Sequence, residues 1–162
     1  MKTFLALSLT AAAALSATPI MAHHSFAMFD PSREEVVEGI IVRWNYSNPH
    51  TFMIIEDPEG TVWAFEGAAP AALASQNPPI TGNTFQVGDP IVVIHCPLRD
   101  GRPGGAAGIF IMEDGSTYST SDAGCRARAR MADWPGWYEQ GYRSLEEVEA
   151  AQAGEGGDET EG

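Results

Sequence analysis

Four histidines are the residues of this sequence best suited to chemistry, and none of them lies in a predicted helix. They are His23, His24, His50 and His95. Imidazole nitrogen binds copper, zinc and nickel, and a flat, nitrogen-rich set of ligands favours Cu(II). Each histidine also has a structural interpretation. His23 and His24 then form a polar chain end, His50 bonds to loop carbonyl groups, and His95 is an ordinary strand residue.

The N-terminal segment decides what His23 can offer a metal. Residues 1–22 combine a positive start, an apolar run and a small final residue, which is the pattern of a secretory signal peptide. Cleavage after Ala22 gives His23 a free α-amine beside its imidazole, and cleavage after Ala17 is the alternative. A membrane anchor is disfavoured because the run is shorter than the ~20 apolar residues of a spanning helix. We therefore expect a periplasmic or secreted protein without a membrane span after cleavage.

The composition limits the partners of the chain. It has 9 basic and 22 acidic residues, a net charge of −13, and its one lysine, Lys2, lies in the expected signal peptide. Because nucleic-acid binding depends on Lys and Arg that neutralise phosphates, we expect no nucleic-acid partner. An acidic chain attracts cations and basic partners. The acidic pairs Glu34–Glu35 and Glu146–Glu147 are interpreted as solvated charge.

Two cysteines, Cys96 and Cys125, leave two interpretations open. In an oxidising compartment an even pair favours a disulfide. The disulfide would fasten the C-terminal part of the chain to the strand that carries Cys96. In the other interpretation Cys96 is a metal ligand. The adjacent His95 is poor evidence for a thiol nucleophile, because neighbours on a strand point to opposite faces.

The elements that must position the histidines are short and β-like. Strands are predicted at residues 35–44, 51–56, 61–66, 91–95 and 108–113, with a helix at 69–75. Turns separate them, including Asp57–Gly60 and a glycine-rich loop at 100–105. This order is that of a small five-stranded OB-like barrel (β-β-β-α-β-β), a mainly β fold. The first and fourth strands can be neighbours in such a barrel, which leaves open an approach of His50 to His95.

Four parts are predicted along the chain. They are a signal peptide at 1–22, the β domain at 23–121, a C-terminal extension at 122–152 and a disordered acidic tail at 153–162. Residues 143–152 predict a short helix, in which Ser144 caps the start and Glu147 completes a capping box. The aromatic stretch 134–138 is expected to pack on the barrel, with ligand stacking as the alternative.

Several short motifs occur together between residues 22 and 115. They are Ala-His-His-Ser-Phe, Gly-Ile-Ile-Val-Arg-Trp, Asn-Pro-His, a hairpin with tryptophan, Gly-Asp-Pro-Ile-Val-Val and Pro-Leu-Arg-Asp-Gly. In combination they resemble a family of small exported bacterial proteins of unknown function. The resemblance implies a secreted OB-like β domain without an established activity. The positions it marks are His23, His24, Asn48, Pro49 and His50. The stretch after Ser121 departs from the pattern, which puts a role of Cys125 in doubt.

Two functions are consistent with these features. The first is a binding or accessory module that captures or delivers one transition-metal ion, with copper favoured. Its ligands would be His23, His24 and His50, with His95 as a candidate fourth ligand. The second is a metal-free OB-type module that binds a peptide, a saccharide or an exported protein partner on one face. Its stacking residues would be Trp44, Trp63, Trp134 or Trp137. An enzyme is the least favoured class, because the chain has no HExxH, paired CxxC, GxSxG or Walker motif. A copper site with an open position remains able to do oxidative chemistry.

Overall fold

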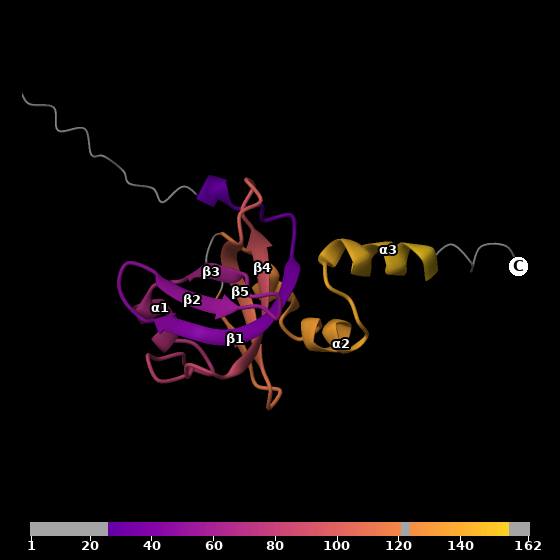
Figure 1. Ribbon diagram of the computed structural model, residues 1–162. Coiled ribbons are helices and arrows are strands. Elements are labelled where there is room, and N and C mark those ends of the chain that lie inside the picture. The colour runs from indigo at the N-terminus through magenta and orange to yellow at the C-terminus, as the bar shows by residue number, and fades with distance from the viewer. Residues whose placement is uncertain (1–25, 121–123, 156–162) are drawn as a thin grey trace, which may run out of the picture.

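The structure, a computed structural model, describes residues 26–120 and 124–155, which form a β-barrel with helices beside it (Figure 1). The strands are β1 (Glu35–Asn45), β2 (Thr51–Glu56), β3 (Val62–Gly67), β4 (Pro90–Pro97), β5 (Gly104–Met112) and β6 (Thr117–Ser119). The α-helices are α1 (Pro70–Ala74), α2 (Trp134–Glu139) and α3 (Leu145–Glu155), and short 3-10 helices span Phe26–Met28 and Ala127–Arg130. The expected signal peptide, His23 and His24 lie outside the described residues.

The strands close into a ring. β1 pairs antiparallel with β2 and β4, β2 pairs with β3, and β4 pairs with β5. A parallel pairing of β3 with β5 completes the barrel, and α1 lies between β3 and β4 in the chain. The mainly β fold with a five-stranded OB-like barrel, predicted from the order of the elements, is therefore confirmed.

Glycine makes this closure sterically feasible. A Cβ atom on Gly104 would lie 2.4 Å from the Ala64 carbonyl oxygen, and one on Gly105 would lie 2.3 Å from the Cys96 carbonyl oxygen. Gly104 also has a φ of 140°, which side chains rarely tolerate. The prediction of a loop over residues 100–105 is therefore wrong for its last two residues, because β5 already begins at Gly104. Glycines that look like a loop in sequence here allow three strands to approach closely.

The barrel interior is one apolar cluster. Alternate residues of the strands point inward, and Met53, Phe65 and Phe110 are almost completely buried there. Leu73 of α1 belongs to the same cluster and has no exposed surface, so α1 packs over one end of the barrel. Buried side chains of this size each contribute roughly 2–3 kcal/mol relative to exposure.

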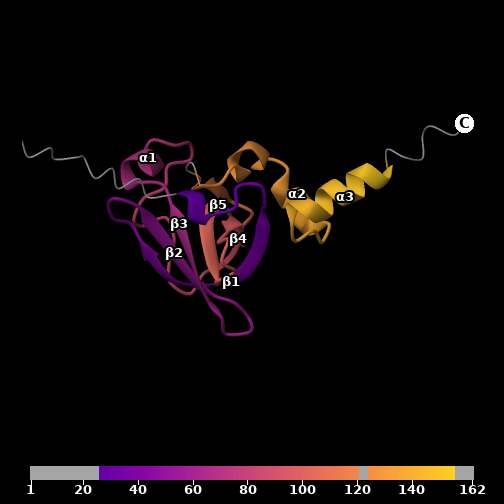
Figure 2. The same ribbon diagram turned by 90° about the horizontal axis from the view of Figure 1, so that it is seen from above.

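A second apolar cluster lies on the outer face of the barrel, beneath the C-terminal extension. Ile94 of β4 and Ile109 of β5 are fully buried there, together with Trp134 of α2. Trp134 confirms that the aromatic stretch packs on the barrel. Figure 2 shows α2 beside the barrel and α3 projecting away from it. β4 is apolar along most of its length because both of its faces are covered.

A disulfide fastens this extension to β4. Cys96 and Cys125 are bonded to each other, across a sequence separation of 29 residues. The interpretation of Cys96 as a metal ligand is therefore wrong, and Cys125 has a structural role despite lying beyond the resembling motifs.

Glu34 corrects the expectation that its acidic pair is solvated charge. Its side chain is fully buried and forms an ion pair with Arg130 of the extension. The indole Nε1 of Trp134 donates a hydrogen bond to the Glu34 Oε2 atom at 2.6 Å. The Glu34 hydrogen bond raises the pKa of the Arg130 guanidinium. Burial of a charge is tolerated only where such partners replace water.

The predicted capping box is present at the start of α3. The Glu147 N–H donates to Ser144 Oγ at 3.2 Å, and the Ser144 N–H donates to Glu147 Oε2 at 3.2 Å. α3 continues to Glu155, three residues into the segment predicted as a disordered tail. Across 26–120 and 124–155, none of the helices combines the length and the hydropathy needed to cross a bilayer.

Candidate functional site

His50 lies in the loop between β1 and β2, where its ring is oriented by β3. The His50 Nδ1 atom is 3.2 Å from Glu66 Oε1 and 3.3 Å from the Gly67 carbonyl oxygen. Both the His50 and Glu66 side chains are 17% exposed. A carboxylate and a carbonyl at one ring nitrogen favour a proton on Nδ1, which then donates to them.

His95 has a different environment, inside the barrel. Its ring contacts Phe65 and Trp63, with centroids 4.9 and 5.8 Å apart, and it has no exposed surface. Neither ring nitrogen has a hydrogen-bond partner of normal geometry. Burial lowers the pKa of His95 to about 4, the Cys96 backbone opposes this shift, and the Arg33 charge adds to it. The imidazole is therefore neutral at physiological pH.

The structure does not bring His50 and His95 together. His95 contacts Phe65, whereas His50 contacts Glu66, and successive strand residues point to opposite faces. The two rings are thus separated by the barrel wall. In the part of the chain that the structure describes, no three His, Cys, Asp or Glu side chains are placed to hold a metal. His23 and His24 belong to the unplaced N-terminal part.

A small hollow lies on the same outer face of β2 and β3 as Glu66. It has a volume of about 440 Å³, and Phe52, Arg102 and Met28 are among its lining residues. Met28 lies in the N-terminal 3-10 helix, and its carbonyl oxygen accepts a hydrogen bond from the Arg99 N–H at 2.9 Å. The described chain therefore starts beside the hollow that contains Glu66, the partner of His50.

The tryptophans do not form an open stacking platform. Trp134 is fully buried and packs edge-to-face on Trp137 at 5.4 Å. Trp63 stacks on Phe65 inside the barrel at 6.1 Å, and Trp44 packs against the same interior cluster. Each of the four tryptophans is buried or half-buried.

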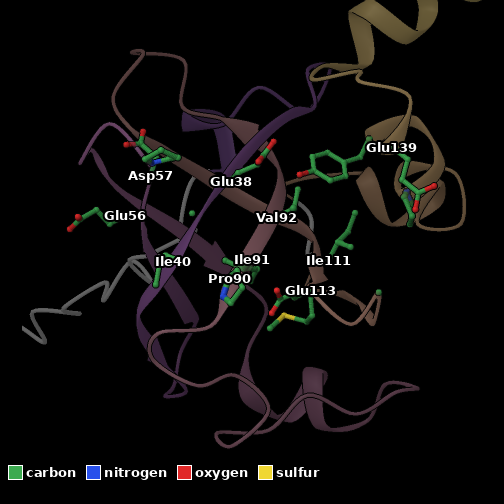
Figure 3. A pocket seen from close by; sticks show the side chains of 16 residues that line it. Glu38, Ile40, Glu56, Asp57, Pro90, Ile91, Val92, Ile111, Glu113 and Glu139 are labelled. Carbon is green, nitrogen blue, oxygen red and sulfur yellow. The ribbon is translucent and has the colours of Figure 1, made fainter.

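A groove with a volume of about 740 Å³ lies between the barrel and α2. Its floor is apolar and includes Ile40 of β1, Val92 of β4 and Ile111 of β5. Ile40 is 46% exposed, which is unusual for a large apolar strand residue beside other apolar groups. Tyr138 of α2 forms part of one wall. In Figure 3, Glu139 lies on the α2 side and Glu56 on the opposite side, with this floor between them.

The charged groups of the groove are all acidic. Its lining includes Glu38, Glu56, Asp57, Glu113 and Glu139, and within the described ranges it includes no Lys or Arg. Two of the five carboxylates have partners. Glu38 pairs with Arg143 at 3.2 Å, and Asp57 accepts a hydrogen bond from Trp63 Nε1 that lowers the pKa of its carboxyl. Burial raises the pKa of Tyr138, and the Glu38 charge adds to this effect.

Comparison with known protein families places the chain in one of them. Residues 11–107 match DUF6152, a family of unknown function. The chain belongs to DUF6152. No curated protein and no solved structure matches it. The family match ends within β5, so α2 and Cys125 of this DUF6152 protein lie beyond it.

Sequence reasoning missed the groove of this DUF6152 protein. The available signal was apolar residues on the outer face of the barrel, such as Ile40 and Ile111, each close in sequence to an acidic residue. That signal is weak in sequence, because the faces of strands depend on register. The α2 wall also comes from a segment more than 20 residues beyond β5, which no local pattern connects to the barrel.

Proposed function

We propose that this DUF6152 protein is an exported binding module, periplasmic or secreted, that captures or delivers one Cu(II) ion and does not turn over a substrate. His50 supplies a ligand from the barrel, and His23 supplies its imidazole and its free α-amine after cleavage behind Ala22. His24 is a further ligand next to it. The Cys96–Cys125 disulfide supports export, because disulfides persist in oxidising compartments.

The orientation of His50 carries the proposal. Histidines that bind metals almost always donate their other ring N–H to a carboxylate or a carbonyl, which fixes the tautomer and strengthens the ligand. His50 has both acceptors at Nδ1, from Glu66 and Gly67. Glu66 is therefore a positioning residue, and Nε2 of His50 is the proposed ligand atom.

The start of the described chain supports a contribution from the N-terminus. Met28 lines the hollow that contains Glu66, and His24 precedes Met28 by four residues. Four residues span at most about 14 Å, so His24 is within reach of this face. His95 is not part of the proposed site, because its ring is enclosed in the barrel.

Titration of the metal-free secreted protein with Cu(II) and Zn(II), followed by calorimetry, tests the proposal. We expect one Cu(II) site with a dissociation constant below ~10 μM and weaker Zn(II) binding. His50→Gln should weaken Cu(II) binding, and Glu66→Gln should weaken it about tenfold or more. Glu113→Gln, the same change in the groove, is the matched control and should leave the affinity unchanged.

Two results would overturn the copper site. One is Cu(II) binding no tighter than ~10 μM in the protein whose N-terminus is shown by mass spectrometry to be His23. The other is equal affinity for Cu(II) in the Glu66→Gln and Glu113→Gln variants.

The metal-free alternative, a module for a peptide, saccharide or protein partner, is supported by a different observation, the groove beside α2.

A further inference from the structure

We propose that the groove between the barrel and α2 binds a basic, amphipathic segment of a partner protein. Apolar side chains of the segment would lie on Ile40, Val92 and Ile111, and its Lys or Arg side chains would lie among the surrounding carboxylates. This proposal uses none of the histidines and is independent of the copper site. It rests on the continuity of an apolar surface and on charge complementarity.

The groove floor continues a surface that this chain already covers elsewhere. On the outer face of β4, Ile94 is fully buried by the extension, whereas Val92, two residues earlier on the same face, is only half-buried in the groove. On β5, Ile109 has no exposed surface, whereas Ile111, two residues later, is 8% exposed and lines the groove floor. The extension therefore covers one part of an apolar stripe and leaves the next part open.

The open part of the stripe widens across the sheet. Ile40 pairs with Glu56 of β2, and Glu56 pairs with Val62 of β3. Ile40 is 46% exposed and Val62 is 54% exposed. Two exposed apolar side chains thus flank an acidic one on neighbouring strands, which gives the floor and its edge the mixed character that an amphipathic segment matches.

The charge around the floor selects the sign of the occupant. Glu56, Glu113 and Glu139 are exposed, and within residues 26–120 and 124–155 no Arg forms an ion pair with them. Like charges on the rim of an apolar groove repel an acidic ligand and attract a basic one, and they speed its encounter. A neutral apolar occupant would leave these carboxylates without a role.

Neither the described residues nor the stretch that follows α3 supplies a suitable occupant. Residues 156–162, which follow α3, contain three acidic residues and no basic residue. Most described arginines are engaged in ion pairs, including Arg33, Arg99 and Arg102 with nearby carboxylates. A second copy would bring a net charge of −13 against the same acidic rim. A partner of opposite charge is therefore favoured over self-association.

Binding of labelled synthetic peptides to the full secreted protein tests the proposal by fluorescence anisotropy. The probe alternates Leu and Lys over about ten residues, and the matched peptides carry Glu or Ser in place of Lys. We expect the Lys peptide to bind at least about tenfold more tightly than either control peptide. Raising the salt concentration should weaken its binding, because the carboxylates are exposed.

Paired variants localise the binding. Glu113→Lys with Glu139→Lys should weaken binding of the Lys peptide at least about tenfold. The control, Glu59→Lys with Glu146→Lys, makes the same change in net charge at exposed sites outside the groove and should have an effect of less than about threefold. Circular dichroism confirms that each variant is folded.

A second pair of variants tests the apolar floor. Ile40→Ser should weaken binding of the Lys peptide several-fold. Val87→Ser is the control, since Val87 is 71% exposed and lies outside the groove. Equal losses in the groove and control variants, or equal binding of the Lys and Glu peptides, would overturn the proposal. Self-association that Glu113→Lys abolishes would also overturn it, because the occupant would then be a second copy.

Discussion

The two apolar clusters of this DUF6152 protein are held in different ways. The barrel interior around Met53 and Phe65 is enclosed by strands that pair with each other on all sides. The outer cluster is closed by a short extension, which adds a disulfide at Cys125 and a buried ion pair at Arg130. The barrel is thus closed by pairing between strands, whereas the extension is fastened by a covalent bond and an ion pair in addition to apolar contacts.

Loss of the disulfide should produce the largest difference in stability between the two clusters. By chain entropy, a cross-link over 29 residues contributes on the order of 3–4 kcal/mol. We expect Cys96→Ala with Cys125→Ala to lower the free energy of unfolding by about that amount, measured by urea denaturation. Hydrogen exchange should rise in residues 124–155 more than in β1 to β5. A uniform rise over both regions would show that the clusters form one cooperative unit.

His95 should make the barrel interior sensitive to acid. Its pKa is about 4 in the folded protein and about 6.5 in the unfolded chain, so the unfolded chain binds the extra proton first as the pH falls. Stability is therefore lost between about pH 6.5 and about pH 4, by roughly 3 kcal/mol from this group.

The His95→Leu variant isolates this contribution. It should unfold in urea with a flatter dependence on pH in that window, while the two proteins should have parallel profiles above about pH 7.5. The comparison with the unchanged protein removes the titration of the carboxylates, which is common to both. Parallel profiles throughout the acid window would contradict a neutral, buried His95.

The Glu34→Gln change tests the polar fastening of the outer cluster. It keeps the shape of the side chain but removes the charge that faces Arg130, and hydrogen bonds to charged groups contribute about 2 kcal/mol. Because Arg130 is 30% exposed, water replaces part of the loss. We expect a decrease of about 2 kcal/mol in the free energy of unfolding. Glu35→Gln, the neighbouring and less buried change, should cost less than about 0.5 kcal/mol.

The smallest effect is expected at the outer end of the extension. Ser144→Ala removes the acceptor for the Glu147 N–H and should cost about 1 kcal/mol of helix stability. α3 buries mainly Leu145 and Val148, so the change should appear as fraying of α3 in hydrogen exchange. Ser75→Ala, at the exposed end of α1, is the control. A large fall in global stability would mean that α3 supports the barrel after all.

Local patterns predicted the fold well. Short β-like runs separated by turns gave the barrel, and the Ser144 and Glu147 spacing gave the capping box. Both depend on neighbours in sequence. The position of β5 was missed at its start, because Gly104 and Gly105 are needed by strands that are remote in sequence and not by a local turn.

The candidate site was less accessible to sequence reasoning. Burial of Glu34 depends on Arg130 and Trp134, which are 96 and 100 residues away in the chain. Whether His50 and His95 meet depends on whether the side chains point into or out of the barrel. The pairing of β4 with β5 shifts register next to His95, so a simple alternation along β4 does not predict its direction. The copper ligands and the division of the chain into four parts stay predictions.

Closure of the barrel also limits how another polypeptide can recognise it. One edge of β5 pairs with β4. On its other edge, the start of β5 pairs with β3 and the end pairs with β6, so little of the β5 backbone is left unpaired. Across the described strands, only β6, three residues long, ends the sheet. Recognition by addition of a strand is thereby disfavoured, and side chains must provide the selectivity. The same closure disfavours edge-to-edge aggregation of this protein.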